Sequence, residues 1–401
     1  MLILHLLSSL LLYFLAKKLS GSSLAGLLSV LFFSLSPLAV YFHRRVLLDN
    51  IMVFWLLLSI VVLIYNLNRG RGLLVSGILF GVSVLTKEVA LLFLPVLVYL
   101  IYVLKTNELM KGITHWVIGL SVVILGYVLF AFARGELFPF QSGNSLVSSV
   151  LYQVTRSSGE GSFMDALRLW VNEDPITVGL GILTIILNFI VGYKYLSYRL
   201  IALLTLPIFI YYLRGGLVYE FYIIAALPFI AINLAFFVYL LIVRARSRYL
   251  KYLCYASVVV IFAGWLLYYS NNSKESYSLF TSNQTLGQRQ SVDWLINNTK
   301  PDSKTVIDSF GYVDLNSASK ETGRRFDYYW KVDADTIVRE EVYKDSSLEI
   351  DYVALTPQME RDIRQVSSLR LTREAVIQGD VISSFWSDGW GVDIIDNIQN
   401  T

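Results

Sequence analysis

Residues 72–104, GLLVSGILFGVSVLTKEVALLFLPVLVYLIYVL, decide the fold of this chain. A bilayer core about 30 Å thick needs about 20 apolar residues per helix, and one helix over this stretch would reach about 50 Å. The stretch is therefore too long for one membrane span. It is also a little short for two spans, which would be joined at Thr86, Lys87 and Glu88. The choice sets the side of the membrane on which every later loop lies.

Apolar runs of similar length lie on both sides of this stretch. They are 2–16, 23–42, 46–66, 113–133, 176–191, 198–213, 217–243 and 252–269. With two spans in 72–104, they predict a polytopic α-helical membrane protein with about ten transmembrane helices. The composition agrees, because 55% of the 401 residues are hydrophobic and only 16% are charged, against about 25% charged residues in soluble domains.

Positive charges decide how 72–104 is interpreted, because cytoplasmic loops carry an excess of Lys and Arg. With two spans, one side holds twelve: Lys17, Lys18, Arg69, Arg71, Lys105, Lys111, Lys194, Arg199, Arg244, Arg246, Arg248 and Lys251. The other side then holds seven: Arg44, Arg45, Lys87, Arg134, Arg156, Arg168 and Arg214. With one span the counts become eight and ten, so we prefer the two-span interpretation.

The net charge of +3 conceals a division of the chain. Residues 1–270 carry 19 Lys and Arg against 9 Asp and Glu, whereas 271–401 carry 14 against 21. We therefore expect a membrane domain over 1–270 and a small extracytoplasmic α/β domain over 271–401. In the second domain we expect helices over 290–298 and 359–366, and strands over 304–309, 350–356, 373–385 and 391–396.

The outer loop 134–175 is too long for a simple connection. Apolar residues fall on one helical face in 145–156 and again in 163–171. Both segments are predicted to be short helices lying in the membrane interface. They would either cover a lipid-accessible cavity or form a plain amphipathic lid, and the sequence leaves both open.

Several chemistries are excluded by what the sequence lacks. The single Cys254 excludes an intramolecular disulfide and a thiolate metal site, and the scattered His5, His43 and His115 argue against a histidine-based metal centre. There is no phosphate-binding glycine loop, no H-E-x-x-H and no G-x-S-x-G motif. No basic patch outside the membrane supports nucleic-acid binding.

What remains is a set of charges that the preferred topology places on the outer side. It comprises His43, Arg44, Arg45, Asp49, Lys87, Glu88, Arg214 and Glu220. Charge at membrane depth is costly, so a cluster facing one way predicts a site, although single members could simply cap helix ends. Cations that hold a phosphate beside a carboxylate base suit a reaction on a lipid-borne anionic substrate.

Short motifs in a fixed order resemble a known family. They are Ser36-Pro37, Arg44-Arg45-x-x-x-Asp49, Gly77-x-x-x-Gly81, Leu85-Thr86-Lys87-Glu88 with Pro95, Glu220-x-Tyr222 with Pro228, Tyr328–Asp335 and Ile350–Tyr352. Together they resemble the polyprenyl-phosphate-sugar glycosyltransferases of the GT-C fold, such as dolichyl-phosphate-mannose protein mannosyltransferases and aminoarabinose transferases of lipid A. The resemblance implies inverting transfer of a hexose or pentose from a lipid phosphate to a protein or glycolipid acceptor.

The resemblance also implies roles for individual residues. Arg44, Arg45 and Lys87 would bind the donor phosphate, although Lys87 could instead be a helix-end lysine that reaches the interface. Asp49 would have a positioning role and would not abstract a proton. Glu88 would pair with a neighbouring cation. Arg214, Glu220 and Tyr222 are further candidates for residues of the site. For Trp330 and its tyrosines, a buried sheet edge is favoured over sugar stacking.

The family's catalytic aspartate lies in an outer loop between its first two helices, and this chain shows no counterpart. The preferred topology places Met1 outside with no basic residues before it, so we expect a helix and an outer loop upstream. No metal-binding residues are assigned, and a divalent ion is left open. The alternative functions are a lipid-linked-sugar transporter or flippase and a non-catalytic subunit that binds lipid-linked sugar.

Overall fold

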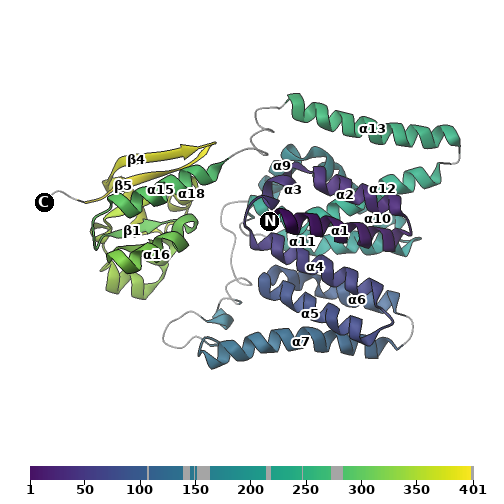
Figure 1. Cartoon of the computed structure of the whole chain (residues 1–401), viewed down its shortest axis with the longest axis horizontal. Helices are drawn as coiled ribbons and strands as arrows, with labels where there is room; N and C mark the ends of the chain where they lie inside the picture. Colours follow the sequence, from purple (N-terminus) through teal and green to yellow (C-terminus); the bar gives the residue numbers. More distant parts are fainter. Residues whose placement is uncertain are drawn as a thin grey trace. The chain divides into compact units, whose positions relative to one another are not determined.

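The computed structural model describes residues 1–105, 108–138, 145–148, 150, 163–213, 218–245, 247–271 and 283–398. The chain divides into two compact units, Met1–Phe280 and Thr281–Thr401 (Figure 1). The division lies ten residues beyond the boundary expected at residue 270.

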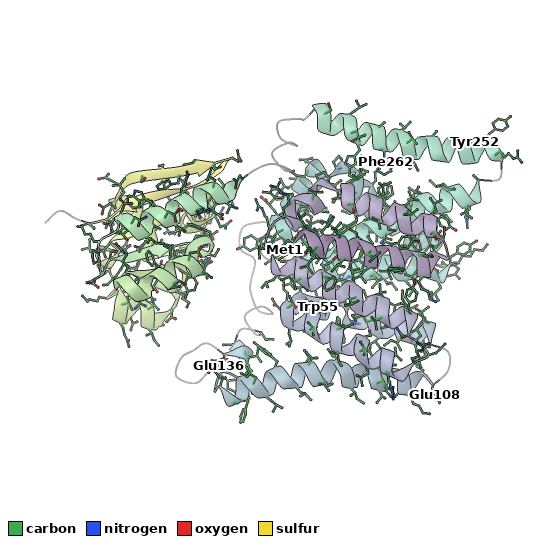
Figure 2. All side chains as sticks on the ribbon, in the orientation of Figure 1. Met1, Trp55, Glu108, Glu136, Tyr252 and Phe262 are labelled. Carbon is green, nitrogen blue, oxygen red and sulfur yellow. The ribbon has the colours of Figure 1, made fainter. Side chains whose placement is uncertain are left out.

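The described part of the first unit is helical. Its elements are α1 (Leu2–Ser20), α2 (Ser23–Leu35), α3 (Pro37–His43), α4 (Leu48–Tyr65), α5 (Gly70–Thr86), η1 (Glu88–Phe93), α6 (Leu94–Leu104), α7 (Leu109–Ala133), α9 (Phe163–Glu173), η2 (Pro175–Leu180), α10 (Gly181–Val191), α11 (Leu196–Leu213), η3 (Glu220–Ala225), α12 (Leu227–Arg244) and α13 (Arg248–Asn271). Glu108 and Glu136 flank the two ends of the long α7 (Figure 2).

Among the described residues, five helices are long and apolar enough to cross a membrane: α1, α4, α7, α11 and α12. Two bent pairs raise this number to seven, α2 with α3 at 66° and α9 with the helix over 175–191 at 120°. Shorter apolar helices cover 70–86, 88–104 and 258–267. Each of the expected apolar runs therefore coincides with a helix or with part of a bent pair, and the chain is an integral membrane protein.

The chain reverses direction at Lys87, as the two-span interpretation of 72–104 requires. Lys87 ends α5 with an extended backbone, φ −157° and ψ 127°, and η1 begins at the next residue. The Nζ atom of Lys105, after α6, donates a hydrogen bond of 2.9 Å to the carbonyl of Leu67, before α5. The end of α6 therefore lies beside the start of α5.

Glycines allow α5 to lie directly against α7, its main neighbour together with α4. A Cβ atom on Gly77 would lie 2.0 Å from the carbonyl oxygen of Trp116, and one on Gly119 would lie 2.1 Å from that of Leu74. A Cβ on Gly81 would lie 2.8 Å from the Cβ of Val123. The Gly77-x-x-x-Gly81 motif is therefore a packing surface of the kind that small residues form between membrane helices.

The second unit is built on a five-stranded sheet of order β2-β1-β3-β5-β4. Its strands are β1 (Lys304–Ile307), β2 (Arg325–Tyr328), β3 (Tyr352–Leu355), β4 (Asp380–Ser387) and β5 (Trp390–Asp396). The strand β1 is parallel to β2 and β3, while β5 is antiparallel to β3 and β4. Among the described residues, five α-helices accompany the sheet: α15 (Gln284–Asn298), α16 (Tyr312–Thr322), α17 (Tyr329–Ala334), α18 (Pro357–Gln365) and α19 (Arg370–Gln378). Three shorter helical segments are η4 (Ser309–Gly311), η5 (Val338–Val342) and η6 (Ser347–Glu349).

Two hydrophobic clusters cover the two faces of this sheet. Adjacent residues of a strand point to opposite faces, and Val306 and Val353 belong to one cluster while Ile307 and Ala354 belong to the other. Along β5, Ile394 and Ile395 divide in the same way. The unit is therefore a small α/β domain with a core on each side of its sheet.

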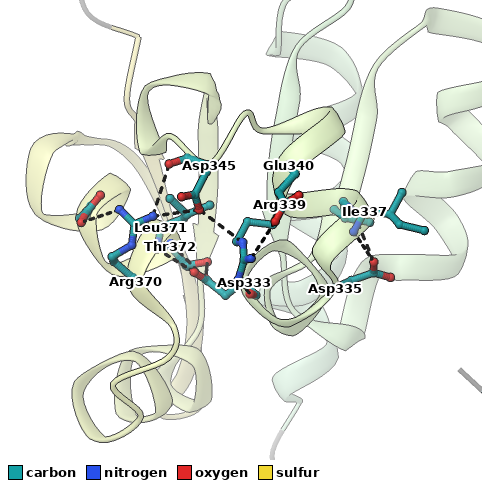
Figure 3. A network of polar contacts seen from close by, with 11 residues as sticks. Asp333, Asp335, Ile337, Arg339, Glu340, Asp345, Arg370, Leu371 and Thr372 are labelled. Carbon is teal, nitrogen blue, oxygen red and sulfur yellow. Dashed lines mark hydrogen bonds and ion pairs between the residues drawn. The ribbon is translucent and has the colours of Figure 1, made fainter. Parts of the chain in front are cut away.

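The strand expected over 373–385 is wrong in its first half, because 370–378 is the helix α19. Leu371 and Ala375 lie one helical turn apart and are both buried. The carboxylate of Asp333 accepts hydrogen bonds from the backbone N–H groups of Leu371 (2.7 Å) and Thr372 (3.3 Å) and from the Thr372 hydroxyl (2.8 Å) (Figure 3). A cap from a residue so far away in sequence stabilises the helix but leaves no local signal.

Candidate functional site

The centre of the candidate site is an ion pair between Lys87 and Asp49. The Nζ atom of Lys87 lies 2.8 Å from each carboxylate oxygen of Asp49. The Lys87 side chain is 17% exposed and that of Asp49 is 5% exposed. Both residues belong to helix termini, Asp49 to the first turn of α4 and Lys87 to the break after α5. The break at Lys87 thus directs the ammonium group to the start of the neighbouring helix.

Aromatic rings from η3 complete the surroundings of Lys87. Its Nζ lies 4.9 Å from the ring centroid of Tyr222 and 5.4 Å from that of Phe221, within the range of cation–π attraction. The hydroxyl of Tyr212 donates a 2.6 Å hydrogen bond to the carbonyl of Tyr222, and the two rings stack. The structure therefore brings Tyr222, a candidate from the sequence, together with Lys87 and Asp49.

The turn between α3 and α4 carries Arg44 and Arg45. The guanidinium of Arg45 donates a hydrogen bond to the Tyr41 hydroxyl and stacks on that ring, with Cζ 4.2 Å from its centroid. Arg44 is exposed. The amide of Asn50 donates to the carbonyls of Phe42 (3.0 Å) and Arg45 (3.1 Å). Asn50, a residue that the sequence did not single out, therefore holds the turn that presents both arginines.

The other candidates have different surroundings. Glu88 is exposed and forms no ion pair with any cation in the described ranges, so the expected pairing is not found there. The Glu220 side chain is exposed, while its carbonyl accepts a 2.7 Å hydrogen bond from the indole of Trp170. Arg214 and most of the predicted helix over 145–156 lie outside the described residues. The other helix expected in that loop is present as α9.

A buried carboxylate that the sequence missed joins the two bent spans. The Ser36 hydroxyl donates a 2.5 Å hydrogen bond to Asp174 Oδ2, and neither residue is exposed. Ser36 begins α3 and Asp174 begins η2, each followed by a proline. A polar residue before proline is a usual helix start. The Asp174-Pro175 and Ser36-Pro37 dipeptides could therefore each have indicated a helix start, but not the contact between them.

The candidate region supplies no evident metal centre. No group of three or more His, Cys, Asp and Glu side chains suited to a metal ion occurs among the residues that the structure describes. His5 and His43 are in edge-to-face contact, with ring centroids 4.6 Å apart. The arrangement at Lys87 offers instead a partly buried cation beside aromatic rings, which suits an anionic group on a lipid.

The aromatic motif of the second unit has a packing role. Tyr329 is 1% exposed and donates a 2.5 Å hydrogen bond to Asp362 Oδ2. Burial, and next that hydrogen bond, raise the pKa of the Tyr329 hydroxyl. Trp330 is half-buried against the same hydrophobic cluster. These contacts agree with the buried sheet edge that the sequence favoured.

Comparisons with known proteins agree with this architecture. The family model of dolichyl-phosphate-mannose-protein mannosyltransferases matches residues 1–132, which include Arg44, Asp49 and Lys87. The solved structure of ArnT from Cupriavidus metallidurans bound to undecaprenyl phosphate is similar with a TM-score of 0.54 and 11% sequence identity. The similarity covers 99% of this chain and 83% of ArnT. No curated protein sequence matches the chain.

The fold and the site thus define a polytopic membrane protein with an ArnT-like fold and a small C-terminal α/β domain. The particular resemblance drawn from the sequence motifs is confirmed in both of its parts. The first third of the chain matches the protein mannosyltransferase model, and the fold is shared with ArnT.

Proposed function

We propose that this chain is a membrane glycosyltransferase that transfers a sugar from a polyprenyl- or dolichyl-phosphate donor to a protein or glycolipid acceptor on the extracytoplasmic face. The observation that carries the proposal is the partly buried Lys87, held by Asp49 beneath the rings of Phe221 and Tyr222. The similarity to ArnT, which was solved with undecaprenyl phosphate, supports a lipid phosphate as the ligand.

In this proposal Lys87 binds the donor phosphate and stabilises the charge that grows on it as the sugar leaves. An ammonium group in a site shielded from water interacts more strongly with such a charge than it would in bulk water. Arg44 and Arg45 supply further positive charge from the neighbouring turn, and Arg45 is already oriented by its stacking on Tyr41. Guanidinium groups suit this task because they can bind two phosphate oxygens at once.

We assign Asp49 to positioning rather than to proton abstraction, because both of its oxygens contact the Lys87 ammonium group. In the reaction, the acceptor hydroxyl oxygen bonds to the anomeric carbon while the bond from that carbon to the phosphate oxygen breaks. The lipid monophosphate departs and the hydroxyl proton passes to a base, which stays unassigned. Glu88, Arg214 and Glu220 stay candidates for the acceptor side, and a divalent ion stays open.

The test is donor turnover by the purified full chain in liposomes, supplied with undecaprenyl-phosphate-linked sugars and a membrane extract as the source of acceptor. We expect release of undecaprenyl phosphate with at least one donor, and a loss of about 100-fold or more in Lys87→Met. Lys111→Met is the matched control, because Lys111 is 71% exposed and pairs with Glu108 away from the site. A parallel reaction with a chelator decides whether a divalent ion takes part.

The outcomes separate the alternatives. If the folded chain binds these donors and never releases lipid phosphate, the hypothesis of a non-catalytic subunit is correct. If the chain moves intact donor across the bilayer, the transporter hypothesis is correct. If Lys87→Met retains full turnover, Lys87 does not bind the donor phosphate.

A further inference from the structure

A pocket lies at the opposite end of α4 and α5 from the Lys87 site. It has a volume of about 520 Å³ and is lined by Val62 and Asn66 of the α4 end and by Arg69, Arg71 and Val75 of the α5 start. The α5 helix has 17 residues, so this pocket and Lys87 are separated by about 25 Å. The pocket therefore cannot belong to the donor site described above.

Its charge is not compensated within the described part of the protein. Arg69 and Arg71 are exposed and form no ion pair with a described residue. More positive charge lies at the same end, because the Nζ atom of Lys18 lies 5.1 Å from the ring centroid of Tyr65, the last residue of α4. Glu108, which directly precedes α7, is already paired with Lys111 at 2.8 Å.

The lining of the pocket also includes apolar side chains, which suit the hydrocarbon chain of a lipid. Val62 lies in the last turn of α4 and Val75 in the first half of α5, and Val75 is 43% exposed. The α4 helix qualifies as a membrane span, so its end marks a boundary of the hydrocarbon region. Two guanidinium groups with valine side chains deeper in the bilayer match a phosphate with an acyl chain attached.

We propose that this pocket binds an anionic phospholipid, with the headgroup phosphate on Arg69 and Arg71 and the acyl chain along Val62 and Val75. Basic pockets between transmembrane helices are suited to anionic headgroups, and the cytoplasmic leaflet is rich in anionic lipid. The excess of Lys and Arg at this end makes it the predicted cytoplasmic side. The site is independent of the glycosyl transfer proposed for Lys87.

The experiment measures phospholipid retained by the purified full chain, using native mass spectrometry after incubation with dioleoylphosphatidylglycerol or dioleoylphosphatidylcholine. We expect selective retention of phosphatidylglycerol. Arg69→Gln with Arg71→Gln should weaken it about thirtyfold, since each guanidinium group that donates directly to the headgroup phosphate contributes about 1 kcal/mol. Val75→Trp should weaken it comparably, because the indole fills the pocket while both charges remain.

The matched control is Lys17→Gln with Lys18→Gln, which removes two cations from the same end without touching the pocket lining. We expect this variant to retain phosphatidylglycerol almost as the wild type does. Equal losses in the lysine and arginine variants would show general surface attraction and overturn the proposal. Full retention by a folded Val75→Trp variant, or equal retention of the two lipids by the wild type, would overturn it as well.

Discussion

Lys87 lies at the centre of the proposed donor site. It interrupts an apolar stretch that would otherwise continue as one helix, and the extended backbone at this break turns its side chain to the start of α4. Asp49 and the rings of Phe221 and Tyr222 then surround the ammonium group. A lysine that only reached the interface would not need these partners, so the contacts argue against that alternative, and the phosphate-binding role is our proposal.

Replacing Asp49 with asparagine tests its positioning role. The amide keeps the size of the side chain but removes the negative charge that orients Lys87 and would repel a phosphate. We expect kcat to fall about tenfold, because one hydrogen bond to a charged group is lost, while KM for the donor falls or stays constant. Steady-state kinetics of donor turnover measure both values. A loss of about 10,000-fold would instead identify Asp49 as the base.

Tyr222 offers a test of the aromatic wall at Lys87. Tyr222→Phe keeps the ring, and the hydrogen bond that Tyr212 donates to the backbone carbonyl does not depend on the side chain. Donor affinity should therefore be about fivefold lower in Tyr222→Ala than in Tyr222→Phe, for a cation–π contribution of about 1 kcal/mol. Equal affinities of the two variants would refute a role for the ring.

At the scale of elements, glycines determine how closely α5 and α7 approach. Helix packing in a membrane depends on close contact rather than on the hydrophobic effect, and Gly77 and Gly119 each place a helix against the backbone of the other. This packing fixes α5 and hence the break at Lys87. The sequence showed the Gly77-x-x-x-Gly81 spacing, but it could not show that α7 supplies the partner.

Two alanine substitutions within α7 test this packing. A Cβ on Gly119 would lie 2.1 Å from the Leu74 carbonyl oxygen, whereas a Cβ on Gly126 would meet no atom within 4 Å. Gly119→Ala should lower the unfolding temperature by several degrees, because the helices must move apart. Gly126→Ala should leave it unchanged or raise it slightly, since alanine favours helix. Thermal unfolding in one detergent compares them, and equal shifts would contradict the packing.

The elements also show where local sequence patterns are insufficient. The apolar runs predicted the membrane helices well, because a bilayer imposes a length and a composition. The helix α19 was mistaken for a strand since its cap, Asp333, comes from a distant part of the chain. The contact of Ser36 with Asp174 is equally long in range, and neither residue alone indicates it.

At the scale of the whole molecule, the sequence predicted a polytopic membrane protein with a small α/β domain, and the structure and its fold similarity to ArnT agree with this prediction. The lengths of the apolar runs and the division of charge along the chain were sufficient for this prediction. The sequence could not predict which cation Asp49 would contact, since Lys87 and Asp49 are separated by 38 residues. The partners of a buried charge depend on how helices pack, which a single sequence does not specify.

The central claim is that Lys87 binds a lipid phosphate. The most direct measurement compares the affinity of the purified full chain for undecaprenyl phosphate and for undecaprenol, in the wild type, Lys87→Met and Lys111→Met. We predict that the wild type and Lys111→Met prefer the phosphate by about tenfold or more and that Lys87→Met loses this preference. An unchanged preference in a folded Lys87→Met variant would contradict the account.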